Sequence, residues 1–262
     1  MNDFLATRNS TREFKDKEFS DELIDEISQI LKDESKLIKN EKAGFILKTD
    51  GDRIFKALNG IGGYEGLMIE APYYIALNTL EDDPVSYIEG AYYMEDIVSK
   101  LKEKEIGFCW VTIKGLNDDT LKRLFGNEEG RIDYLLAIGY PKEESKPHKF
   151  DDRIGIDKIV FIDDLKTPAT IEELENRGLD QLFYYLRYVP STLNKQPWRF
   201  LIEDNTVKLY VKDYEGIENL VDSGIIMYYF TRLAESLAIK ANWDINPLLN
   251  EEEYKFIAKT NI

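Results

Sequence analysis

The residues best suited to bind an anion lie near the N-terminus, where residues 8–14 read Arg-Asn-Ser-Thr-Arg-Glu-Phe. The guanidinium groups of Arg8 and Arg12 stay charged at physiological pH and present several N–H donors in one plane. Together with the hydroxyl groups of this segment they can converge on a phosphate, which makes Ser10 a candidate as well. The same arginines can instead pair with acidic neighbours on a solvated surface. The residues alone leave both interpretations open.

A second polar segment, residues 189–200, reads Val-Pro-Ser-Thr-Leu-Asn-Lys-Gln-Pro-Trp-Arg-Phe. Two prolines, the first of them Pro190, restrict its backbone. Ser191, Thr192 and Asn194 supply hydrogen-bond donors and acceptors that suit the edge of a planar heterocycle. The alternative is an ordinary proline-rich connection between two elements.

A third segment, residues 107–110, reads Gly-Phe-Cys-Trp. The small Gly107 permits close approach of a flat ligand, although a glycine here can equally end a helix. Cys109 is the only cysteine, and we interpret it as a buried packing residue because it has no partner for a disulfide. The only histidine, His148, lies in a lysine-flanked stretch and is interpreted as a surface residue. The sequence therefore predicts neither a nucleophile–base pair nor a metal site.

The charge balance excludes several kinds of partner. Lys and Arg number 34 against 50 Asp and Glu, a net charge of −16 over 262 residues. Such a negative field repels nucleic acids and anionic lipids, so an anionic ligand needs a local basic pocket. No apolar run approaches the roughly 20 residues of a membrane span, and the N-terminus has no signal-peptide pattern. We expect a cytoplasmic protein without nucleic-acid or membrane partners.

Periodicity and capping signals predict an α+β protein. We expect a first helix capped by Ser20, a long helix from Pro84 and an irregular glycine-rich stretch at 59–64. A capping box at 170–173 predicts a helix that continues to Leu186. The remaining predicted elements are strands at 44–47, 72–77, 135–139 and 159–162, a hairpin of 198–203 with 207–211, and a last helix over 222–239.

The order of elements also suggests an internal repeat. A long helix followed by a tryptophan occurs at 90–110 and again at 224–243. This pattern predicts two quasi-repeats, 1–166 and 167–262, although coincidence between two amphipathic helices would look the same. Helices interleaved with locally paired strands favour an α+β layer arrangement.

Taken together, the segments resemble the FMN-dependent nitroreductase family. Residues 8–14 resemble its Arg-x-Ser-x-Arg-x-Phe phosphate motif, and 190–200 match its Pro-Ser-x-x-Asn-x-Gln-Pro-Trp flavin loop. Residues 107–110 resemble its segment near the isoalloxazine ring. Residues 153–160 resemble the tail in which an arginine, here Arg153, reaches the FMN phosphate.

The resemblance implies a nitroreductase-like α+β fold and an oxidoreductase that uses FMN, with NADH or NADPH as electron donor. The acceptor would be a small molecule such as a nitroaromatic or a quinone. No catalytic side chain is implied, because the flavin carries the chemistry. The implied cofactor-binding residues are Arg8, Asn9, Ser10, Arg12, Phe108, Cys109, Trp110, Arg153, Pro190, Ser191, Thr192 and Asn194.

The distribution of the motifs departs from the usual family pattern. Ordinary members carry the arginine motif and the flavin loop in one short protomer, whereas here the first lies at 8–14 and the second at 190–200. The chain therefore resembles a fused, pseudo-dimeric variant that keeps one site, for which a monomer suffices. Two other functions stay open: a flavin store or sensor without turnover, and an FMN-free relic that acts as an interaction protein.

Overall fold

The protein forms two compact units in a computed structural model that describes residues 8–80, 83–126, 130–143, 153–249 and 253–262. We call Asn9–Lys146 the N-terminal unit. The C-terminal unit comprises Pro147–Ile262 together with the segment that ends at Arg8. These boundaries separate compact units and do not test whether the sequence is duplicated. The predicted boundary between quasi-repeats at 166/167 therefore stays a prediction.

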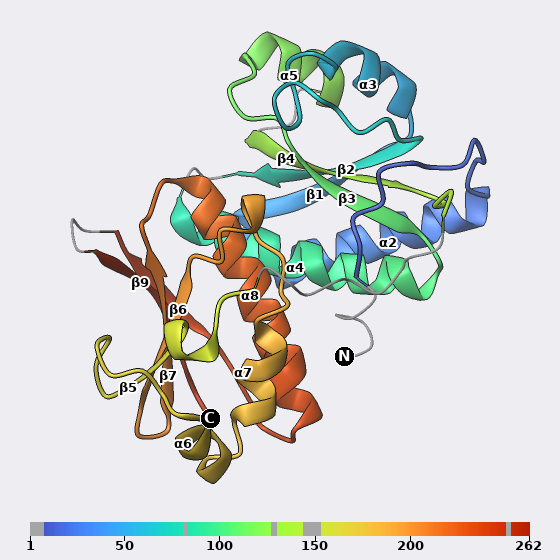
Figure 1. Ribbon diagram of the computed structural model, residues 1–262. Helices are drawn as coiled ribbons and strands as arrows, with labels where there is room; N and C mark the ends of the chain where they lie inside the picture. The colour runs from blue at the N-terminus through green and yellow to red at the C-terminus, as the bar shows by residue number, and fades with distance from the viewer. Residues whose placement is uncertain (1–7, 81–82, 127–129, 144–152, 250–252) are drawn as a thin grey trace. The chain divides into compact units, whose positions relative to one another are not determined.

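The N-terminal unit is built on a four-stranded antiparallel sheet with the order β1-β2-β4-β3. Its helices cover both faces, with α2 and α4 on one side and α3 and α5 on the other (Figure 1). The strands are β1 (Ala43–Lys48), β2 (Tyr73–Thr79), β3 (Gly107–Thr112) and β4 (Arg131–Gly139). The helices are α2 (Asp21–Leu37), α3 (Gly51–Leu58), α4 (Pro84–Glu103) and α5 (Asp118–Phe125).

Local signals explain where the two long helices of this unit begin. The hydroxyl of Ser20 accepts a hydrogen bond from Leu23 N at 3.2 Å, which confirms the predicted cap of α2. Asp83 caps α4 in the same way, and Pro84 fits the first turn because it needs no hydrogen bond there. Gly90 lets α4 lie directly on β2, since a Cβ at this position would come within 2.6 Å of a Leu77 methyl carbon.

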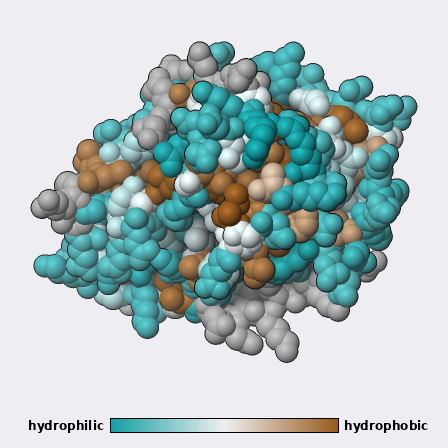
Figure 2. Space-filling view, turned by 90° about the horizontal axis from the view of Figure 1, so that it is seen from above, coloured by the Kyte–Doolittle hydropathy of each residue, from teal (hydrophilic) through white to brown (hydrophobic). Residues whose placement is uncertain are grey.

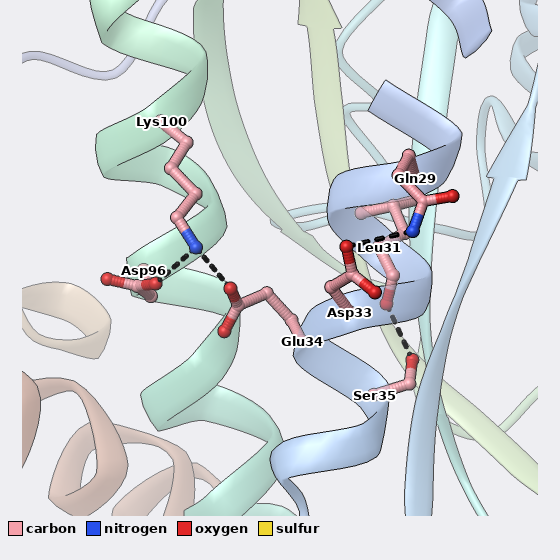
Figure 3. A network of polar contacts seen from close by, with 7 residues as sticks. All are labelled: Gln29, Leu31, Asp33, Glu34, Ser35, Asp96 and Lys100. Carbon is pink, nitrogen blue, oxygen red and sulfur yellow. Dashed lines mark hydrogen bonds and ion pairs between the residues drawn. The ribbon is translucent and has the colours of Figure 1, made fainter. Parts of the chain in front are cut away.

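A polar network joins α2 to α4 (Figure 3). The Lys100 ammonium pairs with Glu34 of α2 and, at 2.9 Å, with Asp96 of its own helix. The Glu34 side chain is almost entirely buried, and this burial raises its pKa although Lys100 opposes the effect. A second ion pair, between Glu26 of α2 and Lys104 at the end of α4 (2.6 Å), adds to this charged contact between the helices.

The loop between α3 and β2 is irregular, as its glycines predict. Gly60 N donates to Gly66 O at 2.9 Å and closes the loop on itself. Its apolar side chains Ile61, Tyr64 and Leu67 are exposed. Figure 2 shows a mostly hydrophilic face with some hydrophobic side chains at the surface, in keeping with a composition that is 32% charged.

The C-terminal unit contains a five-stranded mixed sheet with the order β5-β6-β7-β9-β8. Only the β5–β6 pair is parallel among the strand pairs of the described residues. An aromatic cluster joins α7, β6 and α8, because the ring of Phe200 lies 5.3 Å from Phe183 and 5.8 Å from Phe230. The elements are β5 (Val160–Ile162), α6 (Ile171–Asn176), α7 (Asp180–Leu186), β6 (Trp198–Glu203), β7 (Thr206–Lys212), α8 (Ile217–Ser236), β8 (Asp244–Leu248) and β9 (Tyr254–Asn261).

Two predicted helix boundaries in this unit are wrong. The helix expected to run from the capping box to Leu186 is interrupted, because Gly178 adopts a left-handed conformation (φ 68°) between α6 and α7. The last helix begins at Ile217 rather than Asp222, and its first turn, 217–220, mixes polar and apolar residues. Asn219 stabilises that turn by accepting a hydrogen bond from Glu215 N at 2.6 Å.

The two units share one topology. With α3 and α5 of the N-terminal unit left out, both units contain the order helix, strand, strand, long helix, strand, strand, namely α2-β1-β2-α4-β3-β4 and α7-β6-β7-α8-β8-β9. In each, these four strands are antiparallel and lie in the order first, second, fourth, third. The α+β fold is confirmed. No described helix has the length and apolar character needed to cross a membrane.

Candidate active site

The candidate flavin loop connects α7 to β6 and has an unusual backbone. Leu193, Asn194 and Gln196 all have positive φ angles, of 52°, 56° and 49°. Asn tolerates this region, but it is uncommon for other residues with a Cβ. Such conformations persist only where surrounding contacts fix them, and they concentrate at ligand-binding sites.

Gln196 supplies several of those contacts. Its backbone N–H donates to the Ser191 hydroxyl at 2.9 Å, and its side-chain amide donates to Asn194 O at 3.1 Å. Its side-chain oxygen accepts a hydrogen bond from Ile154 N at 3.1 Å. Gln196 is buried and was not among the predicted site residues. It closes the loop and ties it to the segment that follows Arg153.

Arg153 contacts the candidate flavin loop directly. One terminal guanidinium nitrogen donates to Val189 O and to the side-chain oxygen of Asn194, both at 2.9 Å. Arg153 and Asn194, two predicted site residues that lie 41 positions apart in the sequence, are therefore in contact. Within the part of the chain that the structure describes, Arg153 bonds neutral oxygens only.

A second arginine lies close to the first. Arg8 is buried, and its Nε donates to the hydroxyl of Tyr229 in α8 at 2.8 Å. Burial lowers the pKa of Arg153, and the positive charge of Arg8 lowers it further. Two guanidinium groups that repel each other in a partly buried place favour an anion between them.

A carboxylate from α8 anchors the start of the loop. Asp222 Oδ1 accepts hydrogen bonds from Thr192 N at 2.9 Å and from the Thr192 hydroxyl at 3.2 Å. The residue is 1% exposed, and burial raises the pKa of Asp222 to about 7 despite these bonds. Its Oδ2 has no partner among the described residues. Sequence reasoning missed Asp222 because it placed the helix start there.

The rest of the arginine motif lies in the N-terminal unit. Thr11 N donates to Phe108 O at 2.8 Å, so the segment runs beside β3. A Cβ on Gly107 would come within 2.5 Å of the Thr11 side chain, so the small residue accommodates this segment of the chain. The side chains of Ser10 and Arg12 are exposed. They are open to a ligand.

The β3 candidates point to opposite faces of their sheet, as successive strand residues do. Trp110 faces α4, where its Nε1 donates to the buried carboxylate of Glu95 at 2.8 Å, and Phe108 shares this face. Cys109 lies in the apolar core that α3 and α5 form with the sheet, and it is a buried free thiol. Its side chain therefore faces away from Trp110, and only its backbone can meet a ligand on that side.

A family model described as "Putative TM nitroreductase" matches residues 2–234, most of the chain. The chain belongs to this nitroreductase family.

One solved structure supports the same fold, and shorter ones show weaker likenesses. A "putative nitroreductase" from Thermotoga maritima msb8 superposes with a TM-score of 0.62 at 19% identity, over 98% of this chain and 92% of that one. An FMN-dependent nitroreductase from Clostridium difficile R20291 is 22% identical over 57% of this chain and 92% of its own, with a TM-score of 0.46. An iodotyrosine deiodinase bound to FMN and 3-iodo-L-tyrosine is 18% identical over 59% and 97%, with a TM-score of 0.43. Among curated proteins, none matches this sequence.

In this chain the predicted site residues fall into two groups. The C-terminal unit brings together Arg8, Arg153 and the loop of Pro190, Ser191, Thr192 and Asn194. The N-terminal unit holds Asn9, Ser10, Arg12, Phe108, Cys109 and Trp110. His148 lies outside the described residues, so its surface position stays a prediction. No group of three or more potential metal ligands occurs in the ranges that the structure describes.

Proposed function

We propose that this nitroreductase is an FMN-dependent oxidoreductase that takes electrons from NADH or NADPH and reduces a small organic acceptor such as a nitroaromatic or a quinone. The observation that carries the proposal is the Arg153 guanidinium, which bonds the Asn194 side chain while the positive charge of Arg8 lies near enough to lower the pKa of Arg153. A phosphate next to them would offset their mutual repulsion through charge-assisted hydrogen bonds.

The donor set fits the phosphate and polar chain of FMN. Two arginines suit a doubly charged phosphate, and neutral amide and hydroxyl groups of the adjoining loop suit a polyol and a heterocycle edge. On a protein of net charge −16, the buried Arg8 and the half-buried Arg153 provide a local positive charge that favours an anion. Bound FMN supplies two-electron chemistry between a nicotinamide and an acceptor.

The protein's own residues would bind FMN and orient it. Arg8 and Arg153 would hold the phosphate, and Asn194 would present its amide from a loop that Ser191 and Gln196 keep closed. Asn9, Ser10 and Arg12 are proposed as further phosphate contacts, and Phe108, Trp110 and the backbone of Cys109 as contacts of the ring. These roles rest on the sequence motifs.

We also propose that the chain is an internal duplication that keeps one flavin site. The shared strand order of the two units supports this, because each unit repeats the same six elements. The chain carries one arginine motif at 8–14 and one flavin loop at 190–200, so it has the parts of one site. A monomer would then suffice, and the cytoplasmic location stays a prediction.

The proposal is tested on purified protein by absorption spectroscopy, FMN titration and assays with NADH or NADPH plus a nitroaromatic or quinone. We expect flavin absorption bands and acceptor-dependent oxidation of one nicotinamide. Flavin binding without nicotinamide oxidation would indicate a store or sensor. A protein that stays colourless and binds no added FMN would indicate the interaction protein and refute the proposal.

A further inference from the structure

Asp222 of α8 has a counterpart in the other compact unit. Asp222 is the sixth residue of α8 and accepts a hydrogen bond from Thr192 N, the first residue of a 3₁₀ turn ahead of β6. Glu89 is the sixth residue of α4 and accepts a hydrogen bond at 3.1 Å from Lys39 N, the first residue of a 3₁₀ turn ahead of β1. Each long helix thus holds the turn that precedes the first strand of the shared topology, β1 in one unit and β6 in the other.

The two anchored turns differ in what they carry. The turn at Lys39–Glu41 lacks the Pro-Ser-x-x-Asn-x-Gln-Pro-Trp motif, and of its three residues only Glu41 has a positive φ. The turn at Thr192–Asn194 lies in the motif, and its last residue bonds Arg153. The same structural device therefore acts on an ordinary connection in one unit and on the candidate flavin loop in the other.

We propose that Asp222 is a positioning residue of the flavin site, which fixes Thr192 and through it holds Asn194 against Arg153. The inference rests on the proposed function, since it assigns a role within that flavin site. Its carboxylate acts at the first residue of the turn, through both the backbone N–H and the hydroxyl of Thr192. Two residues later the chain reaches Asn194, after left-handed Leu193.

The physical reason is that left-handed residues with a Cβ do not hold their conformation unaided. Gln196 closes the loop from its end, and Asp222 fixes its start. Without the acceptor at Asp222, Thr192 N would be left unbonded in a half-buried place, and the loop would populate other conformations. Arg153 would then lose the Asn194 oxygen for part of the time.

The test compares three variants of the full chain by FMN titration, thermal unfolding and amide hydrogen exchange. Asp222→Ala removes the acceptor and should weaken FMN binding about tenfold or more. Asp222→Asn keeps an acceptor oxygen and should stay within about threefold of the unsubstituted chain. Glu89→Ala removes the matching bond in the other unit, so it should lower thermal stability and leave FMN affinity unchanged.

Hydrogen exchange gives a readout that does not depend on flavin. Asp222→Ala should speed exchange at Thr192–Gln196, and Asp222→Asn should restore protection. Unchanged exchange in Asp222→Ala would overturn the inference whether or not FMN binds. Equal losses of FMN affinity in Asp222→Ala and Glu89→Ala would also overturn it, because they would indicate general destabilisation. Failure of the unsubstituted chain to bind FMN would instead refute the proposed function, while the exchange data still decide whether Asp222 positions the loop.

Discussion

Trp110 and Trp243 make the same kind of contact, each with the long helix that precedes it. Trp110 Nε1 donates to Glu95 of α4 at 2.8 Å. Trp243 Nε1 donates to the Thr231 hydroxyl at 3.2 Å and to Met227 O at 3.3 Å, both in α8. In both units an indole after the helix folds back on it, which the spacing of the two tryptophans suggests already at the level of sequence.

The recurrence extends to the carboxylates that anchor the 3₁₀ turns. The two tryptophans are 133 positions apart, and so are Glu89 and Asp222. A duplication would account for a buried anchor and an indole donor at the same separation. The match supports the proposed duplication.

If the duplicated chain keeps one site, it should bind about one FMN per chain as a monomer, because linked halves need no partner chain. Quantification of released FMN against protein, with mass from light scattering, measures both quantities. Two flavins per chain would contradict the single site. Flavin retention confined to dimers would contradict a monomeric site.

The arginine pair should dominate phosphate binding. Hydrogen bonds to charged groups contribute about 1.5–3 kcal/mol, so Arg8→Ala or Arg153→Ala should weaken FMN binding roughly 10- to 100-fold. Arg177→Ala is the matched control, since Arg177 is exposed and its guanidinium bonds the carbonyl oxygen of Asp204. Affinity that is unchanged in both site variants, with the fold intact, would place these arginines on an ordinary solvated surface.

Asn194 should matter for flavin binding through its side chain. Asn194→Gly keeps the left-handed backbone (φ 56°) and removes the oxygen that Arg153 bonds. FMN affinity should therefore fall about tenfold with little change in unfolding temperature. Asn194→Leu puts an apolar side chain at a left-handed position that Asn tolerates better, so it should also lower stability by about 1–2 kcal/mol. A Gly variant that binds FMN normally would show that only the backbone of this loop matters.

The buried carboxylate of Asp222 should make stability depend on pH. Burial raises its pKa to about 7 from 3.8, with Glu218 adding to the rise and Lys195 opposing it. Between these values the folded chain holds a proton that the unfolded chain has lost, so stability falls as pH rises through 7. Asp222→Asn removes this dependence.

The unfolding free energy of Asp222→Asn, relative to the unsubstituted chain, should accordingly rise by at least about 1.4 kcal/mol between pH 5 and pH 8. Urea unfolding at the two pH values measures it. A difference that stays constant with pH would mean that Asp222 is ionised in the folded chain throughout.

Lys100 should stabilise the N-terminal unit by compensating buried Glu34. Removing one partner of a fully buried pair costs about 3–5 kcal/mol. The Lys100 side chain is 40% exposed, so solvent screening reduces the expected loss for Lys100→Met to about 1–2 kcal/mol at pH 7. The loss should shrink toward pH 5, because the raised pKa of Glu34 then lets it take up a proton.

Lys36→Met, which breaks the exposed pair with Asp33, should change stability by less than about 0.5 kcal/mol. Equal losses in the two variants would contradict the role of burial.

The features that sequence predicts correctly are local ones. The Ser20 cap and the Thr170–Glu173 capping box each join residues three positions apart. The β6–β7 hairpin closes over Asp204 and Asn205, so its register is set by neighbouring residues. The residue types and their spacing in the sequence are enough to predict such contacts.

The features that sequence misses depend on contacts between distant parts of the chain. Asp222 bonds Thr192 from 30 positions away, and nothing near Asp222 in the sequence marks it as an anchor. The orientation of Cys109 follows from which residue of β3 meets which helix, and a four-residue motif does not contain that information. Arg153 and Asn194 came from the family motif, and their contact follows from the fold.

The burial of Cys109 provides a natural probe of local unfolding in this chain. It is the only thiol in the chain, and it lies inside the apolar core of the N-terminal unit. A thiol reagent can therefore react only when that core opens, and the rate of labelling reports opening of this unit alone. Unfolding confined to the C-terminal unit would leave the Cys109 thiol unreacted. Labelling of this native cysteine can therefore show whether the two units unfold together or separately, without any engineered probe.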